Sequence, residues 1–200
     1  MDNLNTGDIL LFKSNSKSII SKVTHSPYTH AAIVVKDPWW SDLDKGLYVI
    51  QSLSNIPDYR DVETNNYKSG VQMEKLETVI RDREVDVRYI YGVNRDINFK
   101  RLFQTIYFRS FNKPYDRNII DWIKVGISNL VCKSCRVRRH SNNFWCSALV
   151  GYFYTELGWL SQRTDWSNLS PGDLSKITAK KPYVLGRVVQ LKIGNMYVLF

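Results

Sequence analysis

The first half of the chain is built from short apolar runs separated by polar and turn-forming residues. Each run has the length of a β-strand and is rich in residues that favour strands. The predicted strands are GDILLFK (Gly7–Lys13), HAAIVVK (His30–Lys36), GLYVIQSL (Gly46–Leu53), GVQMEKL (70–76) and VDVRYIY (Val85–Tyr91). Between the first two, SIISKVTH (Ser18–His25) predicts a turn of helix.

The apolar spacing then becomes helical. In NFKRLFQTIYFRSF the apolar residues recur at the intervals of an amphipathic helix. They are Phe99, Leu102, Phe103, Ile106 and Phe111. Two more helices are predicted, one over Asp116–Val131 and one that begins near Cys146 in SNNFWCSALVGYFYTELGWL.

At the C-terminal end, LSPGDLSK predicts a turn. GRVVQLKI and MYVLF predict strands that are joined by a tight hairpin at Gly194-Asn195. Strands, then helices, then strands again predict an α+β fold in which an antiparallel sheet packs against helices and both ends of the chain complete the sheet. We expect a single domain over residues 1–200.

Composition fits one globular domain, since 44% of the 200 residues are hydrophobic. No apolar run reaches the ~18 residues expected of a transmembrane helix, and the segment MDNLNTGDILLFK does not resemble a secretory signal. Three cysteines are an odd number, which favours a reducing compartment over a disulfide framework. We therefore expect an intracellular or virion-packaged protein.

The charge of +9 is uneven along the chain. Residues 1–99 contain 12 Lys and Arg against 14 Asp and Glu, whereas residues 100–200 contain 16 against 5. A basic half favours an anionic partner, such as lipid headgroups, nucleic acid or an acidic substrate. A solvated surface that keeps the protein soluble explains the same charge, and both interpretations stay open.

Cys146 is the first candidate for chemistry. If Asn142 or Asn143 caps the helix, the thiol lies in its first turn, where the helix dipole and free N–H groups lower the pKa of a thiol. A thiolate is a nucleophile, and a neighbouring backbone N–H stabilises a developing oxyanion. The alternative is that Cys146 only fills the core.

A cysteine nucleophile needs a base, and the histidines are His25, His30 and His140. His30 is preferred over His25 because it begins a strand, which holds the ring rigidly. If Val35 pairs with Gly46 in the following hairpin, His30 lies opposite Gln51 on the same face. The amide oxygen of Gln51 then orients the imidazole.

In chain order, GDILLFK, SPYTHAAIVV, YVIQSL, KPYD, FWCSALVGYFY and LSPGDL resemble the circularly permuted papain-like hydrolases of the NlpC-related superfamily. The nearest group is the YiiX/YaeF-like amidases, which include poxvirus members. The lecithin retinol acyltransferase family is a more distant relative. The resemblance covers roughly residues 7–174, and it includes the histidine-before-cysteine order that distinguishes this permuted group from ordinary papain-like enzymes.

The resemblance implies a permuted papain-like fold with Cys146 as nucleophile, His30 as general base and Gln51 as the third polar residue. Many relatives have Glu or His where this chain has Gln51, which cannot form an ion pair with imidazolium. Tyr28 and Tyr115 match aromatic positions that line the substrate site. No metal and no organic cofactor is implied.

The expected function is a cysteine hydrolase or acyltransferase that acts on an amide, thioester or ester. The substrate is peptide-like or a lipid acyl group, an anionic membrane surface is an expected partner, and nucleic acid is disfavoured. The alternative is a catalytically silent lipid- or peptide-binding module on the same fold.

Two further readings of the residues stay open. Cys132, Cys135, His140 and Cys146 are spaced C-x2-C-x4-H-x5-C, one residue off a zinc knuckle. This pattern suggests a zinc site that binds nucleic acid, and the RVRRH run suggests docking on anionic lipid. Trp39 and Trp40 lie in a predicted hairpin loop, where they either cover the core or touch an interface, and the core is favoured.

Overall fold

The computed structural model describes residues 3–13, 26–116 and 142–191. Its main sheet has six strands in the order β4-β3-β2-β1-β5-β8, and each neighbouring pair is antiparallel. The strands are β1 (Ile9–Lys13), β2 (Tyr28–Lys36), β3 (Leu47–Leu53), β4 (Gly70–Lys75), β5 (Val85–Arg88) and β8 (Val189–Gln190). A small second sheet pairs β6 (Ile90–Tyr91) with β7 (Val184–Leu185).

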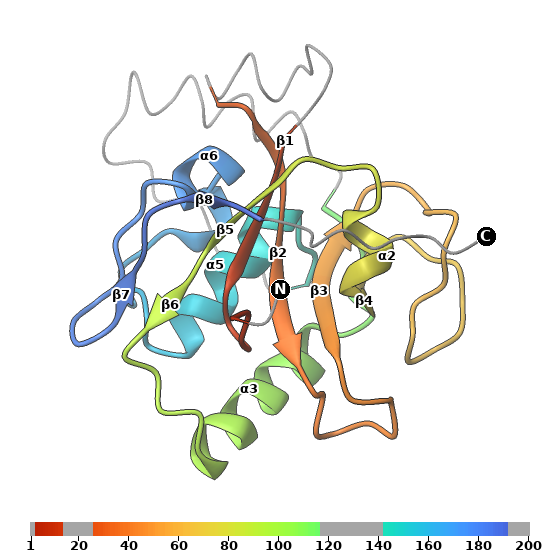
Figure 1. Cartoon of the computed structure of the whole chain (residues 1–200), viewed down its shortest axis with the longest axis horizontal. Helices are drawn as coiled ribbons and strands as arrows, with labels where there is room; N and C mark the ends of the chain where they lie inside the picture. Colours follow the sequence, from red (N-terminus) through yellow and green to blue (C-terminus); the bar gives the residue numbers. More distant parts are fainter. Residues whose placement is uncertain (1–2, 14–25, 117–141, 192–200) are drawn as a thin grey trace.

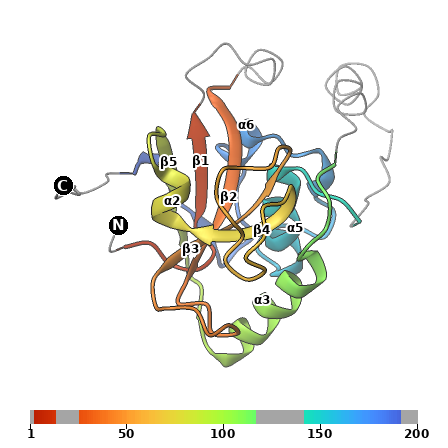
Figure 2. The same cartoon turned by 90° about the vertical axis from the view of Figure 1, so that its right-hand side faces the viewer.

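Helices cover both faces of the main sheet (Figures 1 and 2). The short helix α2 lies on one face, and α5 and α3 lie on the other. The helices are α2 (Leu76–Ile80), α3 (Ile97–Ser110), α5 (Cys146–Glu156) and α6 (Pro171–Leu174), with a 3₁₀ turn at Trp166–Asn168. The chain is thus an α+β protein with a mostly antiparallel sheet.

The near-continuous apolar runs of the sequence follow from this burial on two sides. In β1, Ile9 and Leu11 face the cluster around α5, whereas Leu10 and Phe12 face the cluster around α2. All four side chains are at most 2% exposed. A strand with only one buried face would alternate apolar and polar residues instead.

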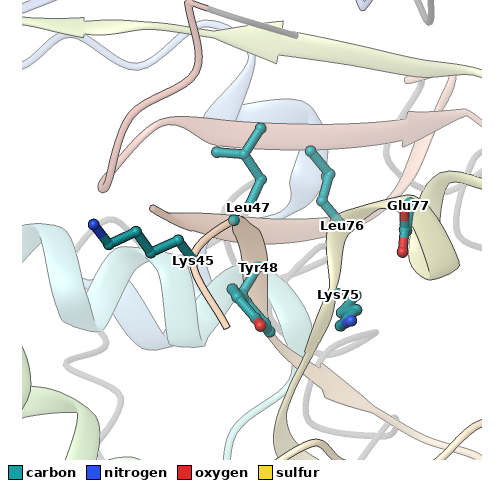
Figure 3. Close-up of a pocket in the computed structure, with 7 residues that line it drawn as sticks. Lys45, Leu47, Tyr48, Lys75, Leu76 and Glu77 are labelled. Atoms are coloured by element: carbon teal, nitrogen blue, oxygen red, sulfur yellow. The ribbon is translucent and has the colours of Figure 1, made fainter. Parts of the chain in front are cut away.

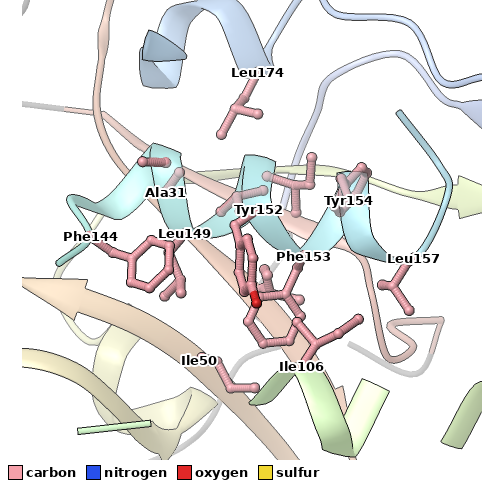
Figure 4. Close-up of a cluster of buried hydrophobic side chains, with 14 of the residues drawn as sticks. Ala31, Ile50, Ile106, Phe144, Leu149, Tyr152, Phe153, Tyr154, Leu157 and Leu174 are labelled. Atoms are coloured by element: carbon pink, nitrogen blue, oxygen red, sulfur yellow. The ribbon is translucent and has the colours of Figure 1, made fainter. Parts of the chain in front are cut away.

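Helix α5 is the centre of the larger cluster. All residues from Cys146 to Thr155 are buried. Figure 4 shows Leu149 and Phe153 directed toward Ile50 and Ile106, with Leu174 of α6 on the other side of the helix. A helix that is apolar all round has to be enclosed in this way. The first turn of α5 is consequently shielded from water.

Most of the predicted elements are confirmed, with differences at the C-terminal end. The five early strands, the helix after residue 97 and the helix at Cys146 are present. LSPGDLSK forms the short helix α6 and not only a turn, because Ser170 and Asp173 make a capping box. GRVVQLKI contributes the edge strand β8. The predicted helices at 18–25 and 116–131 and the hairpin at 194–195 fall outside the described residues, apart from Asp116.

In the part of the chain that the structure describes, no helix has the length and apolarity needed to cross a bilayer.

Candidate active site

Cys146 is the first residue of α5, as the sequence predicts, but the cap is different. The predicted cap at Asn142 or Asn143 is wrong: the N-cap residue is Trp145, and no side chain caps the helix. The reason is that Phe144, just before it, is buried and bonded through its backbone to Pro114 and Asp116. The first backbone N–H groups of α5, those of Cys146 and Ser147, hydrogen-bond the Cys146 thiol instead.

The start of α5 lies where β2 and β3 separate. Their ladder ends at the pair Ile33–Ile50. Beyond it, the Ser52 hydroxyl donates to the Phe144 carbonyl oxygen at 2.6 Å. On the other side, the backbone amide of Ala31 hydrogen-bonds the Cys146 thiol. The sulfur therefore lies next to Ala31, the residue that follows His30 in β2.

His30 and Gln51 are in direct contact. Nε2 of His30 lies 2.8 Å from Oε1 of Gln51. The predicted register is wrong by two residues, because Val35 pairs with Tyr48 and not with Gly46. A shift of two residues leaves every side chain on the same face, so the long Gln51 side chain still reaches His30 as a diagonal neighbour.

Several side chains that belong to none of the sequence motifs surround His30 and Gln51. The ring of Phe12 lies 5.1 Å from that of His30, next to the irregularity in the β1–β2 ladder. Gln51 Nε2 donates to the Tyr59 hydroxyl at 3.3 Å. Arg83 is close enough to act electrostatically on both His30 and Tyr59. Tyr59 and Arg83 were missed by the sequence reasoning because they come from loops, where no periodic pattern indicates a role.

The nucleophile and the base approach from opposite sides of the sheet. His30 and Gln51 share the face of Phe12, Ala32 and α2, whereas α5 packs on the other face. Among the described residues no hydrogen bond joins the Cys146 thiol to His30. The structure thus brings His30 and Gln51 together, but it does not bring the thiol of Cys146 to the imidazole. Nδ1 is the imidazole nitrogen that Gln51 leaves available.

Burial sets the protonation states of both groups. It raises the pKa of the Cys146 thiol, and hydrogen bonds from the backbone of Ala31 and Ser147 only partly oppose this. Burial also lowers the pKa of His30 to about 4; Gln51 opposes this shift and Arg83 adds to it. The expectation of a lowered thiol pKa is thus not met, since desolvation outweighs the helix dipole. In the resting state Cys146 is therefore a thiol and His30 a neutral imidazole.

Alkylation of Cys146 should therefore be slow at pH 6 and should still accelerate above pH 9. The reason is that the thiolate fraction increases about tenfold per pH unit until the raised pKa is passed. Iodoacetamide labelling followed by peptide mass mapping measures this rate. Urea-unfolded protein is the control, because Cys146 is then an ordinary thiol. A rate plateau between pH 5 and 7 in the folded protein contradicts the raised pKa.

Tyr115 lies close to the nucleophile. Segment 114–116 runs beside Phe144, and burial raises the pKa of Tyr115, with a smaller contribution from the charge of Cys146. Gly70 leaves room for the backbone of this segment. Its φ is +89°, and a Cβ at this position would lie only 2.4 Å from the carbonyl oxygen of Lys113. The Tyr115 hydroxyl is consequently a candidate oxyanion donor.

Tyr28 occupies a different position. It is 8% exposed, and its hydroxyl donates to Asp86 Oδ2 at 2.5 Å. Burial, reinforced by Asp86, raises the pKa of Tyr28. Lys13 forms an ion pair with the same carboxylate at 3.0 Å. Tyr28 thus lies near the base in sequence, but its hydroxyl is already committed to a buried acceptor.

A cavity of about 350 Å³ lies elsewhere (Figure 3). It is formed where β3 begins and β4 ends, at the opposite end of β3 from Gln51. Its lining is Lys45, Gly46, Leu47, Tyr48, Lys75, Leu76 and Glu77. None of these is a candidate catalytic residue, so this cavity is separate from the site at Cys146.

The other predictions have mixed outcomes. Trp39 and Trp40 are partly buried against the main core, as favoured, and their rings meet edge to face at 4.8 Å. The described residues contain no cluster of metal-ligating side chains. Cys132, Cys135 and His140 of the zinc pattern, the RVRRH run and the alternative base His25 all lie outside the described residues.

No family model and no curated protein matches this chain.

Proposed function

We propose that the protein is a cysteine hydrolase or acyltransferase with a permuted papain-like fold, in which Cys146, His30 and Gln51 form the catalytic triad. The observation that carries this proposal is the 2.8 Å contact between Nε2 of His30 and Oε1 of Gln51, on the strand whose next residue, Ala31, hydrogen-bonds the thiol of Cys146. This contact leaves Nδ1 as the basic nitrogen. The nearby Ala31 amide holds the thiol at the same strand.

In the proposed reaction, Nδ1 of His30 removes the thiol proton while the sulfur attacks the substrate carbonyl carbon. Because the resting groups are neutral, proton transfer and attack occur together and no stable ion pair precedes them. The N–H of Cys146 and a second donor, for which Tyr115 is the candidate, stabilise the oxyanion. The imidazolium then protonates the leaving group.

The product of this first step is a thioester on Cys146, and the leaving group departs as an amine, alcohol or thiol. His30 next activates either water or a second acceptor, which attacks the thioester carbonyl. Hydrolysis and acyl transfer differ only in that acceptor. We propose a peptide-like or lipid acyl substrate, with an anionic membrane surface as a partner of the basic half of the chain.

A second candidate is a catalytically silent binding module on the same fold. Two observations favour it: burial raises the pKa of the Cys146 thiol, and the third position is an amide that does not stabilise imidazolium by charge.

Acyl-probe labelling separates the two candidates. The full-length protein is incubated with p-nitrophenyl acyl esters and with acyl thioesters, and its intact mass is followed. The enzyme gains one acyl group, which maps to the Cys146 peptide and is removed by hydroxylamine. No adduct, or adducts formed equally fast on Cys132 and Cys135, refutes the proposed enzyme.

A further inference from the structure

The Gln51 side chain lies between two polar partners. It is fully buried, its Oε1 faces Nε2 of His30 at 2.8 Å, and its Nε2 faces the Tyr59 hydroxyl at 3.3 Å. A primary amide accepts hydrogen bonds at one end and donates them at the other. The direction of this amide therefore decides where the imidazole carries its hydrogen.

We propose that Tyr59 is a positioning residue whose hydroxyl oxygen accepts the Gln51 Nε2–H and so keeps Gln51 Oε1 turned toward His30. With an oxygen acceptor in front of it, Nε2 of His30 must carry the hydrogen, since a neutral imidazole has only one N–H. The lone pair is then on Nδ1. This inference rests on the proposed function, in which Nδ1 takes the thiol proton.

The surroundings make this control effective. Phe12 covers the imidazole, and the positive charge of Arg83 acts on both His30 and Tyr59. Burial, with a smaller contribution from Arg83, lowers the pKa of His30 to about 4, so the imidazole is neutral near pH 7. Where little water reaches an amide, protein partners and not solvent fix its direction. Within the described contacts of Gln51, Tyr59 is the side-chain partner of Nε2.

Tyr59→Phe tests the inference, because it removes the acceptor and keeps the ring. ¹⁵N chemical shifts of the full-length protein at pH 7 distinguish the two tautomers, and the His30 signals are those lost in His30→Gln. We expect the wild type to carry hydrogen on Nε2 and the variant to show a mixture with hydrogen on Nδ1. Acylation of Cys146 should slow by at least ~10-fold, since a wrong tautomer is known to cost up to ~10⁴.

Two comparisons separate positioning from general damage. Tyr67→Phe alters an exposed tyrosine in the same loop and should change neither tautomer nor rate. In a Gln51→Glu background both ends of the side chain are oxygens, so its direction no longer matters to His30. Adding Tyr59→Phe to this background should therefore slow acylation far less than it does in the wild type. An equal loss in both backgrounds overturns the positioning role.

A wild-type tautomer with hydrogen on Nδ1, or a Tyr59→Phe variant with the wild-type tautomer, also overturns the inference. The tautomer is read without turnover. A wild type that never acylates therefore refutes the proposed enzyme, while the NMR result still decides the role of Tyr59.

Discussion

His30→Gln is expected to slow the acylation of Cys146 by about 10²–10⁴-fold, the usual contribution of a general base. A buried thiol with a raised pKa forms little thiolate by itself, so attack depends on a base that removes its proton. In the wild type the rate should fall as the pH drops through about 4, where His30 becomes protonated and loses its lone pair. Acyl transfer from a p-nitrophenyl ester, followed by intact mass, gives the rate.

Matched variants identify the base. Cys146→Ala provides the background, with no adduct, and His25→Gln should leave the rate at the wild-type level. A thermal melt and a circular dichroism spectrum show whether His30→Gln is folded. A folded His30→Gln protein that acylates at the wild-type rate excludes His30 as the base, and a loss confined to His25→Gln gives that role to His25.

Asp61→Ala should destabilise the fold by about 3–5 kcal/mol, the cost of breaking a buried, hydrogen-bonded ion pair from one side. Asp61 is fully buried. Its carboxylate accepts hydrogen bonds from Thr64 and from the backbone amides of Glu63 and Met73. It also forms an ion pair with Lys68 at 3.2 Å. Alanine removes the acceptor of the Thr64, Glu63 and Met73 donors, whereas Lys68 still reaches Asn112. Urea unfolding measures the free energy, and the midpoint should fall.

Asp58→Ala is the control for this stability change. Asp58 is an exposed carboxylate in the same loop, and its removal should alter the free energy of unfolding by no more than about 0.5 kcal/mol. Equal effects of the two substitutions contradict the role given to the Asp61 hydrogen bonds. Asp61→Asn is expected to give an intermediate loss of stability, because the amide keeps one of the two acceptor oxygens.

The sequence predicts the strands well because each apolar run is long enough and is covered on both faces. It also predicts the His30–Gln51 contact, although the assumed register is wrong. Strand periodicity fixes the face of a side chain, and a two-residue error preserves that face. The turn at Gly46 and the length of the loop before it determine the true register, and their geometry is not visible in a pattern of apolar residues.

The electrostatics of the site are harder to predict. A helix start indicates a positive potential at Cys146, but the pKa of the thiol depends on how completely Ala31, Phe144 and the rest of the core exclude water. That burial results from tertiary packing and not from local sequence. The N-cap was misassigned for a similar reason, since the backbone bonds of Phe144 to residues 114 and 116 outweigh the capping preference of asparagine.

The separation of β2 from β3 also has a consequence for the order of events during synthesis. The hydroxyl of Ser52 meets the carbonyl of Phe144 across 92 residues, and that of Tyr154 meets the carbonyl of Gly7 across 147. Contacts so distant in sequence form late and slow folding. A nascent chain on the ribosome thus contains His30 and Gln51 long before Cys146, and the proposed site is complete only after α5 has left the exit tunnel and docked.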